Sequence, residues 1–127
     1  MITQTTHGIS VSVDIFYRDQ YSQPENDKFF FAYKVRIENQ SATTVQLLSR
    51  RWKIFDSNNI SRKVEGEGVV GEQPVLTPGQ AHEYVSWCHL KTEIGKMEGT
   101  YLMQNDQENR FRVRIPKFDL IASYRMN

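Results

Sequence analysis

The strongest constraint on this chain is a period-two alternation of apolar and polar residues that recurs along most of its length. Residues 9–15 place Ile or Val at every second position, with Ser or Asp between them. Residues 29–39 repeat the alternation with Phe, Tyr, Val and Ile on one face. Since successive side chains of a strand point to opposite faces of a sheet, both segments are predicted to be half-buried β-strands. No segment has a convincing helical spacing of apolar residues, and the short stretch 91–97 is the only helix candidate.

Turn signals separate the alternating segments at short intervals. The polar stretch 18–28 contains Pro24 and predicts a long hairpin loop. Pro116 is predicted to end the last strand, because proline cannot donate to a ladder. Strands are predicted at residues 9–15, 29–39, 45–56, 60–64, 80–90, 99–104 and 110–115. About seven or eight short strands with frequent turns are typical of an all-β antiparallel sandwich.

Length and charge restrict the classes of function. A chain of 127 residues corresponds to one domain, whose core is large enough to fold without metals or disulfides. The 16 basic and 15 acidic residues are spread along the chain and leave a net charge of +1. General nucleic-acid binding needs a concentrated basic surface, so we expect no nucleic-acid partner, although a small local basic patch is compatible with this balance.

The predicted location is the cytoplasm. The only cysteine, Cys88, excludes an internal disulfide and suits a reducing compartment. Residues 1–7 lack the basic and apolar regions of a signal peptide. The apolar runs fall far short of the roughly 20 residues that a membrane helix needs. We therefore expect a cytoplasmic protein that does not contact a membrane.

One motif stands out after the fourth predicted strand. It matches G-x-G-x-x-G and consists of Gly66, Glu67, Gly68, Val69, Val70 and Gly71. In a dinucleotide-binding fold, such glycines lie between a parallel strand and a helix whose N-terminus binds a pyrophosphate. Here Pro74 and Pro78 exclude that helix, and the glutamates at 65, 67 and 72 would repel a phosphate. Two interpretations remain open: a loop whose glycines serve only backbone geometry, and a loop that binds a protein or a ligand.

A second candidate is the basic pair Arg50 and Arg51 on the predicted strand 45–56. Alternation directs Trp52 inward and Arg51 outward, with Arg50 on the same face as Trp52, near its edge. These arginines form either a solvated sheet face or an anion clamp that uses the bidentate geometry of the guanidinium group.

No catalytic or metal-binding constellation emerges. The histidines His7, His82 and His89 are scattered, and adjacency directs the side chains of Cys88 and His89 to opposite faces of a strand. Neither a strained nucleophile turn nor an oxyanion loop accompanies Cys88, which is therefore assigned to the core. The aromatic residues assigned to the core are Trp52, Tyr84, Trp87 and Tyr101. We predict no catalytic residue, no metal and no cofactor.

Four segments, in order, resemble the ApaG family: Leu47-Leu48-Ser49-Arg50-Arg51-Trp52, Gly66-Glu67-Gly68-Val69-Val70-Gly71-Glu72-Gln73-Pro74, Leu76-Thr77-Pro78-Gly79 and Met97-Glu98-Gly99-Thr100-Tyr101. The resemblance implies one domain over residues 1–127, with a core at 9–118 and a C-terminal tail at 119–127. It implies an immunoglobulin-like, fibronectin-type-III-like β-sandwich in a small bacterial protein without established enzymatic activity, and a link to cobalt and magnesium homeostasis. Similar domains are fused in eukaryotic F-box proteins and in a polymerase-delta-interacting protein, which implies protein–protein interaction.

The favoured hypothesis is a non-enzymatic protein–protein interaction module with an unidentified protein partner. Its predicted interface is the glycine-rich loop, in which Val69 and Val70 supply the apolar contact and Glu67 and Glu72 supply rim charges. The loop residues of this prediction are Gly66, Glu67, Gly68, Val69, Val70, Gly71 and Glu72.

Two other hypotheses concern the same loop. Its amides could bind a small anion, namely a phosphate, pyrophosphate or nucleotide, with Arg50, Arg51 or Arg62. Divalent-cation binding by the loop glutamates is a weaker alternative, because such sites need several converging oxygens. The predicted strand 9–15 is a candidate sheet edge, which leaves a homodimer open.

Overall fold

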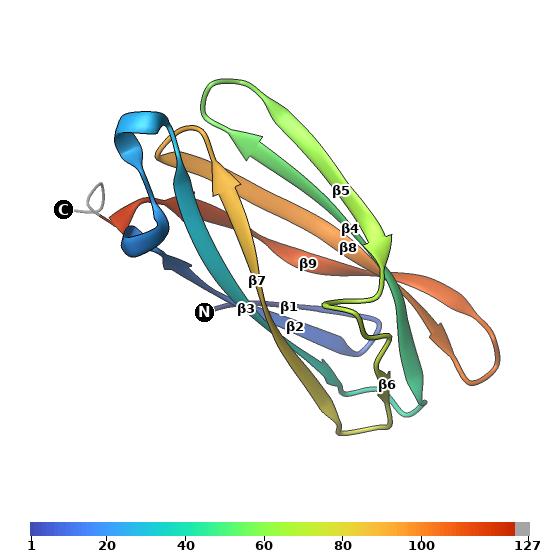
Figure 1. Cartoon of the computed structure of the whole chain (residues 1–127). Coiled ribbons are helices and arrows are strands. Elements are labelled where there is room, and N and C mark those ends of the chain that lie inside the picture. The colour runs from blue at the N-terminus through green and yellow to red at the C-terminus, as the bar shows by residue number, and fades with distance from the viewer. Residues whose placement is uncertain (124–127) are drawn as a thin grey trace.

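Two antiparallel β-sheets pack face to face in the computed structural model, which describes residues 1–123 (Figure 1). The first sheet has the order β1-β2-β3-β7, with the respective bounds Ile2–Thr6, Ile9–Tyr17, Phe29–Asn39 and Ala81–Leu90. The second has the order β5-β4-β8-β9, with the bounds Ser61–Glu67, Val45–Asp56, Ile94–Asn105 and Arg110–Ile121. A two-residue strand, β6 (Val75–Leu76), pairs with β4. The predicted antiparallel sandwich is confirmed, with β1 and β6 as additional short strands.

The alternating apolar residues of both sheets meet in one core. On β2 and β3, every second side chain is buried or packs against the core, and these side chains pair across the strands, as Val11 does with Ile37. Aromatic rings join the two sheets, since the Tyr33 ring of β3 lies 5.4 Å from Trp52 of β4 and 6.0 Å from Phe118 of β9. These large buried rings supply much of the apolar area that stabilises the sandwich.

The sandwich is closed on one side and open on the other. β1 packs against β9, and the Arg114 amide donates to Thr6 Oγ1 at 3.2 Å. On the opposite side, β5 and β7 are the outermost strands of their sheets in the described chain. The predicted edge strand at 9–15 is wrong, because β1 pairs with β2 along its whole length, from Ile2 opposite Val13 to Thr6 opposite Ile9.

Three other boundaries differ from the sequence prediction. β5 extends beyond residue 64 to Glu67, so Gly66 is a strand residue. The helix candidate at 91–97 is wrong, because a turn at 91–93 leads directly into β8. β9 continues past Pro116, because Pro116 and Lys117 together oppose the single residue Glu98 in a β-bulge.

The predicted tail at 119–127 begins inside β9. Leu120 and Ala122 are fully buried, so the core extends beyond residue 118. Residues 124–127 of that prediction lie outside the described residues.

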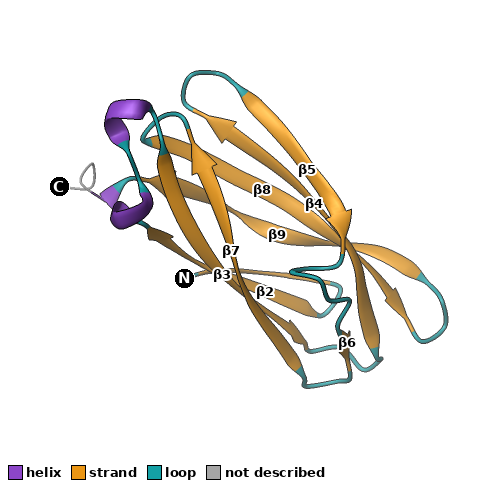
Figure 2. Cartoon of the chain, in the orientation of Figure 1, coloured by secondary structure: helices purple, strands orange, loops and turns teal. Residues whose placement is uncertain are grey.

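The predicted loop 18–28 contains two short 3-10 turns, η1 (Asp19–Tyr21) and η2 (Pro24–Asn26), which Figure 2 shows at one end of the sandwich. Within the part of the chain that the structure describes, no helix is long and apolar enough to cross a membrane.

Candidate functional site

The glycine-rich run forms the end of β5 and a tight turn after it. β5 stays paired with β4 up to Glu67. Two bonds close the turn: the Val69 amide donates to the Glu72 carbonyl oxygen (2.8 Å), and the Glu72 amide donates to the Val69 oxygen (3.1 Å). Positive φ angles occur at Gly68 (61°), Val70 (48°) and Gly71 (78°). The turn therefore needs glycine for backbone geometry, whatever else it does.

Arg50 fastens this turn to β4. Its Nη1 atom donates to the carbonyl oxygens of Glu67 and Gly68, both at 2.9 Å. Gly66 lies against the guanidinium group, since a Cβ atom there would be 2.8 Å from Arg50 Nη2. The Gly68 amide donates to the Leu48 carbonyl oxygen at 2.9 Å. The turn thus presents oxygens to a cation, and three of its amides are bonded within the fold, whereas an anion-binding concavity needs free amides.

Arg50→Ala is expected to lower the free energy of unfolding by about 2 kcal/mol, because two carbonyl oxygens lose a charged donor. Urea denaturation of both proteins measures the difference. The matched control is Arg51→Ala. Among residues 1–123, the one ion pair of Arg51 joins its Nε atom to the exposed Glu65 at 3.1 Å. An exposed pair of this kind contributes less than about 1 kcal/mol. Equal losses for the two variants would contradict the anchoring role of Arg50.

The three candidate arginines are not brought together. Arg50 points inward to the turn and Arg51 points outward, as alternation predicts. Arg62 extends across the open side of the sandwich, where its Nη2 atom donates to the His89 carbonyl oxygen (2.5 Å) and to Cys88 Sγ (3.7 Å). A single small anion could not contact all three guanidinium groups.

Only part of the predicted interaction loop is accessible. Val69 is 1% exposed and belongs to the core, so it is not an apolar contact for a partner. Val70 is 64% exposed at the tip of the turn. The Glu72 carboxylate lies 3.7 Å from His82 Nε2. The loop therefore offers one valine beside acidic residues, which is a small target for a partner.

The Cys88 thiol and the hydroxyl groups of Tyr84 and Tyr101 are buried between the two sheets. Burial raises the pKa of Cys88 to about 11, so its thiol is protonated at neutral pH and is a poor nucleophile. Burial also raises the pKa values of Tyr84 and Tyr101, whose hydroxyl groups share a hydrogen bond between the sheets. These three residues are in the core, as predicted. Across residues 1–123, no group of three His, Cys, Asp or Glu side chains could hold a metal ion.

One surface was not predicted from the sequence. We define the aromatic surface as the outward-facing cluster formed by Phe16, Arg18, Tyr21, Phe30 and Trp87. Trp87 is 52% exposed, so its assignment to the core is wrong. The Tyr21 ring meets the Trp87 ring edge-on, with centroids 5.6 Å apart. A shallow hollow of about 320 Å³ is lined by Tyr21, Phe30 and Trp87.

Cross-strand register explains the cluster. Phe16, Ala32 and Trp87 are neighbours on β2, β3 and β7, and Ala32 is 1% exposed although it lies on the outer face. The Arg18 guanidinium carbon lies 6.0 Å from the Phe16 ring and 5.9 Å from the Trp87 ring, within reach of cation–π attraction. Alternation could have identified Trp87 as outward, because it is opposite in phase to the buried Cys88.

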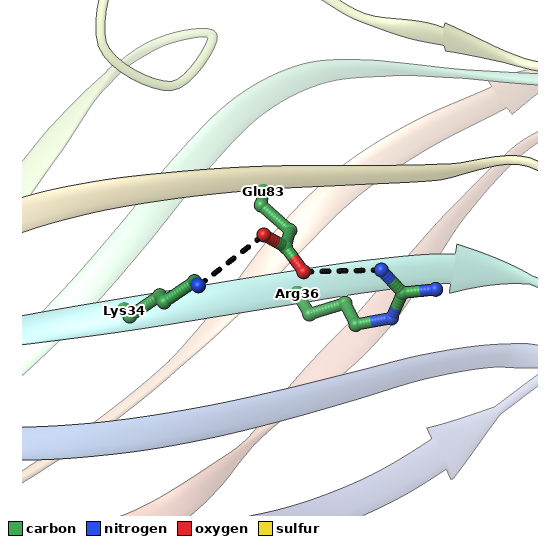
Figure 3. Close-up of polar contacts among 3 residues, drawn as sticks. All are labelled: Lys34, Arg36 and Glu83. Carbon is green, nitrogen blue, oxygen red and sulfur yellow. Dashed lines mark hydrogen bonds and ion pairs between the residues drawn. The ribbon is translucent and has the colours of Figure 1, made fainter.

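A charged cluster on β3 and β7 occupies another part of the same outer face. Figure 3 shows the Glu83 carboxylate of β7 between Arg36 and Lys34 of β3, at 3.0 Å and 3.4 Å. The hydrogen bond from Arg36, followed by that from Lys34, lowers the pKa of the Glu83 carboxyl group. The Glu83 carboxylate is therefore held by two cations of the neighbouring strand.

The outer face of the second sheet has a different character. It carries a depression of about 780 Å³ whose charged lining consists of five cations and two carboxylates: Arg51, Lys53, Lys63, Arg114, Lys117, Glu65 and Glu98. Among the described residues, Arg51 alone of these cations forms an ion pair. The local basic patch of this chain lies here and not at the glycine-rich turn.

Two antiparallel sheets with this strand order define an immunoglobulin-like, fibronectin-type-III-like β-sandwich protein. The chain belongs to the ApaG family, since the family model of the ApaG domain matches residues 19–105. It is 48% identical to Protein ApaG of Paramagnetospirillum magneticum and 45% identical to that of Brucella canis, in each case over 120 residues that cover 94% of this chain and 92% of the relative. An ApaA protein from Bordetella pertussis, known from its crystal structure, is 39% identical with a TM-score of 0.87, covering 95% of this chain and 97% of that one. The resemblance seen in the sequence is confirmed.

Proposed function

We propose that this ApaG-family protein is a non-enzymatic protein–protein interaction module, and that the aromatic surface is its interface. The observation that carries the proposal is the exposure of Trp87 and Tyr21, at 52% and 58%, beside the Arg18 guanidinium. Trp, Tyr and Arg are the residue types that contribute most of the binding energy at protein interfaces. An exposed apolar patch of this kind on a folded domain is typical of an interaction site.

The fold supports this role by holding the cluster in place. Phe16, Phe30 and Trp87 lie on three adjacent paired strands, and the Tyr21 ring packs edge-on against Trp87. A surface that is ordered before binding loses little conformational entropy when a partner docks. The charged cluster around Glu83 would give the interface a polar rim.

The proposal moves the interface away from the glycine-rich loop. Val69 is in the core, and Val70 is the one accessible valine of the turn. Small-anion binding by the loop, the alternative hypothesis, is disfavoured because three of the loop amides, those of Gly68, Val69 and Glu72, are bonded within the fold. The cytoplasmic location and the link to cobalt and magnesium homeostasis stay predictions.

Affinity capture from native cytosol tests the proposal. A bait that carries both Trp87→Ala and Tyr21→Ala is expected to bind its partner at least about 30-fold more weakly than the wild type. Truncation of a hot-spot residue typically costs about 2 kcal/mol of binding free energy. The matched control is Val75→Ser, which truncates an exposed apolar residue (56%) outside the aromatic surface. Thermal unfolding verifies that every bait is folded. Equal capture by the wild type and the double variant would refute the assigned interface.

A further inference from the structure

β7 is an edge strand whose two ends are covered by neighbouring groups but whose middle has little protection against pairing. It pairs with β3 over ten residues without a bulge or register shift, and it contains no proline. Its outer face exposes Val85 (50%) and Trp87 (52%). Edge strands are normally protected by charges, prolines, bulges or covering loops. β7 carries one such charge, Glu83, whereas β5, the other strand on the open side, carries four: Arg62, Lys63, Glu65 and Glu67.

The register shows which backbone groups of β7 are available. The Asn39 amide donates to the Gln80 carbonyl oxygen (2.9 Å), so even-numbered residues of β7 face β3 and odd-numbered residues direct their amides and carbonyls to the open edge. The His89 carbonyl oxygen accepts a hydrogen bond from Arg62, as expected for an odd-numbered residue that faces the open edge. This bond occupies the C-terminal end of the edge. At the other end, the contact between Glu72 and His82 brings the glycine-rich turn alongside β7. The available stretch runs from 83 to 87 and is centred on Val85.

We propose that this stretch pairs with β7 of a second copy of the chain, antiparallel about a two-fold axis at Val85. The inference rests on the proposed function and names a partner for the same surface. In this register Val85 opposes Val85 of the second copy, and Trp87 opposes its Glu83. The β1-β2-β3-β7 sheets of the two copies then form one continuous sheet, and the aromatic surfaces of both copies lie on its outer face.

Charge complementarity supports a second copy as the occupant. The Arg18 guanidinium carbon lies 5.9 Å from the Trp87 ring, and Arg18 forms no ion pair among residues 1–123. The two-fold register places Glu83 of the second copy opposite Trp87, next to the ring that Arg18 approaches. The Glu83 carboxylate accepts from Arg36 and Lys34 of its own chain and has acceptor capacity left for a third cation. Because the axis repeats this contact on both sides, one surface supplies both halves of the interface, as a two-fold dimer requires.

Sedimentation equilibrium of the full chain tests this dimer. The mass is expected to rise with concentration from 14.9 kDa toward twice that value. Pairing through a small interface predicts a Kd in the range of about 1–100 µM. Val85→Pro removes an edge-facing amide that the monomer does not use, a position where proline is tolerated, and should raise the Kd at least about 100-fold.

The matched control is Lys63→Pro on the other exposed edge. The bond from Gly68 to Leu48 sets the phase of β5, and Lys63 therefore also directs its amide to the open edge. The dimer Kd of this variant should stay within about twofold of the wild-type value, because β5 lies outside the proposed interface.

Amide hydrogen exchange of the wild type gives a test that needs no variant. The amides of Glu83, Val85 and Trp87 should exchange more slowly as the protein concentration rises, because pairing protects them. A mass of 14.9 kDa at every concentration, or a dimer whose Kd does not respond to Val85→Pro, overturns the inference. If the chain stays monomeric while the Trp87 and Tyr21 bait still loses its captured proteins, the proposed function stands and the partner is a different protein.

Discussion

Val69→Asp is expected to destabilise the native state by more than about 4 kcal/mol, because it places an unpaired carboxylate in the core. Val69 is 1% exposed and packs within the main apolar cluster. A domain of this size typically has only about 5–15 kcal/mol of stability, so the variant should be partly or wholly unfolded at 25 °C. Urea denaturation followed by tryptophan fluorescence measures the loss.

The same substitution one residue later is the control. Val70 is 64% exposed and has a φ angle of 48°, a region that suits Asp better than a β-branched residue. Val70→Asp should therefore change the free energy of unfolding by less than about 1 kcal/mol, in either direction. Similar stability of the two variants would show that Val69 is not a core residue.

This contrast changes how binding by the glycine-rich loop can be tested. A double replacement of Val69 and Val70 would abolish binding by unfolding the protein, whatever the loop does. Val70→Asp alone alters the accessible part of the turn and leaves the core intact. Loss of a captured protein with this single variant would assign the loop a place in the interface.

The sequence predicts strands well where one face is buried and the other is solvated. The predicted segments 29–39 and 45–56 coincide with β3 and β4, because apolar alternation and turn residues both mark their limits. β1 was not predicted, since Ile2–Thr6 has a single strongly apolar residue. Its position depends on pairing with β2 and packing on β9, and neither contact is encoded locally.

The candidate sites were harder to predict for the same reason. Alternation places Arg50 on the inward face with Trp52, but its partners, the carbonyl oxygens of Glu67 and Gly68, come from 17 and 18 residues away. For Trp87, alternation indicates the face opposite Cys88. It does not reveal that β7 is a sheet edge, which depends on the order of four strands.

Gly68→Ala is expected to lower the free energy of unfolding by more than about 3 kcal/mol, since it combines backbone strain with a steric clash. Gly68 has a φ angle of 61°, and a Cβ atom there would lie well inside van der Waals contact with the Glu72 carbonyl oxygen. That oxygen cannot move away freely, because it accepts the Val69 amide. The Gly68 oxygen is itself held by Arg50, so relief of the clash would break bonds on both sides of the turn.

Gly71→Ala separates the two contributions. Gly71 has a φ angle of 78°, but a Cβ atom there would have no neighbour within 4 Å, so only the strain of the left-handed conformation applies, about 1–2 kcal/mol. Urea denaturation of both variants should therefore rank Gly68→Ala as clearly more damaging. Equal losses would contradict the close approach to Glu72. The second and third glycines of the G-x-G-x-x-G run are thus explained by a buried contact and by a backbone angle, and a phosphate is needed for neither.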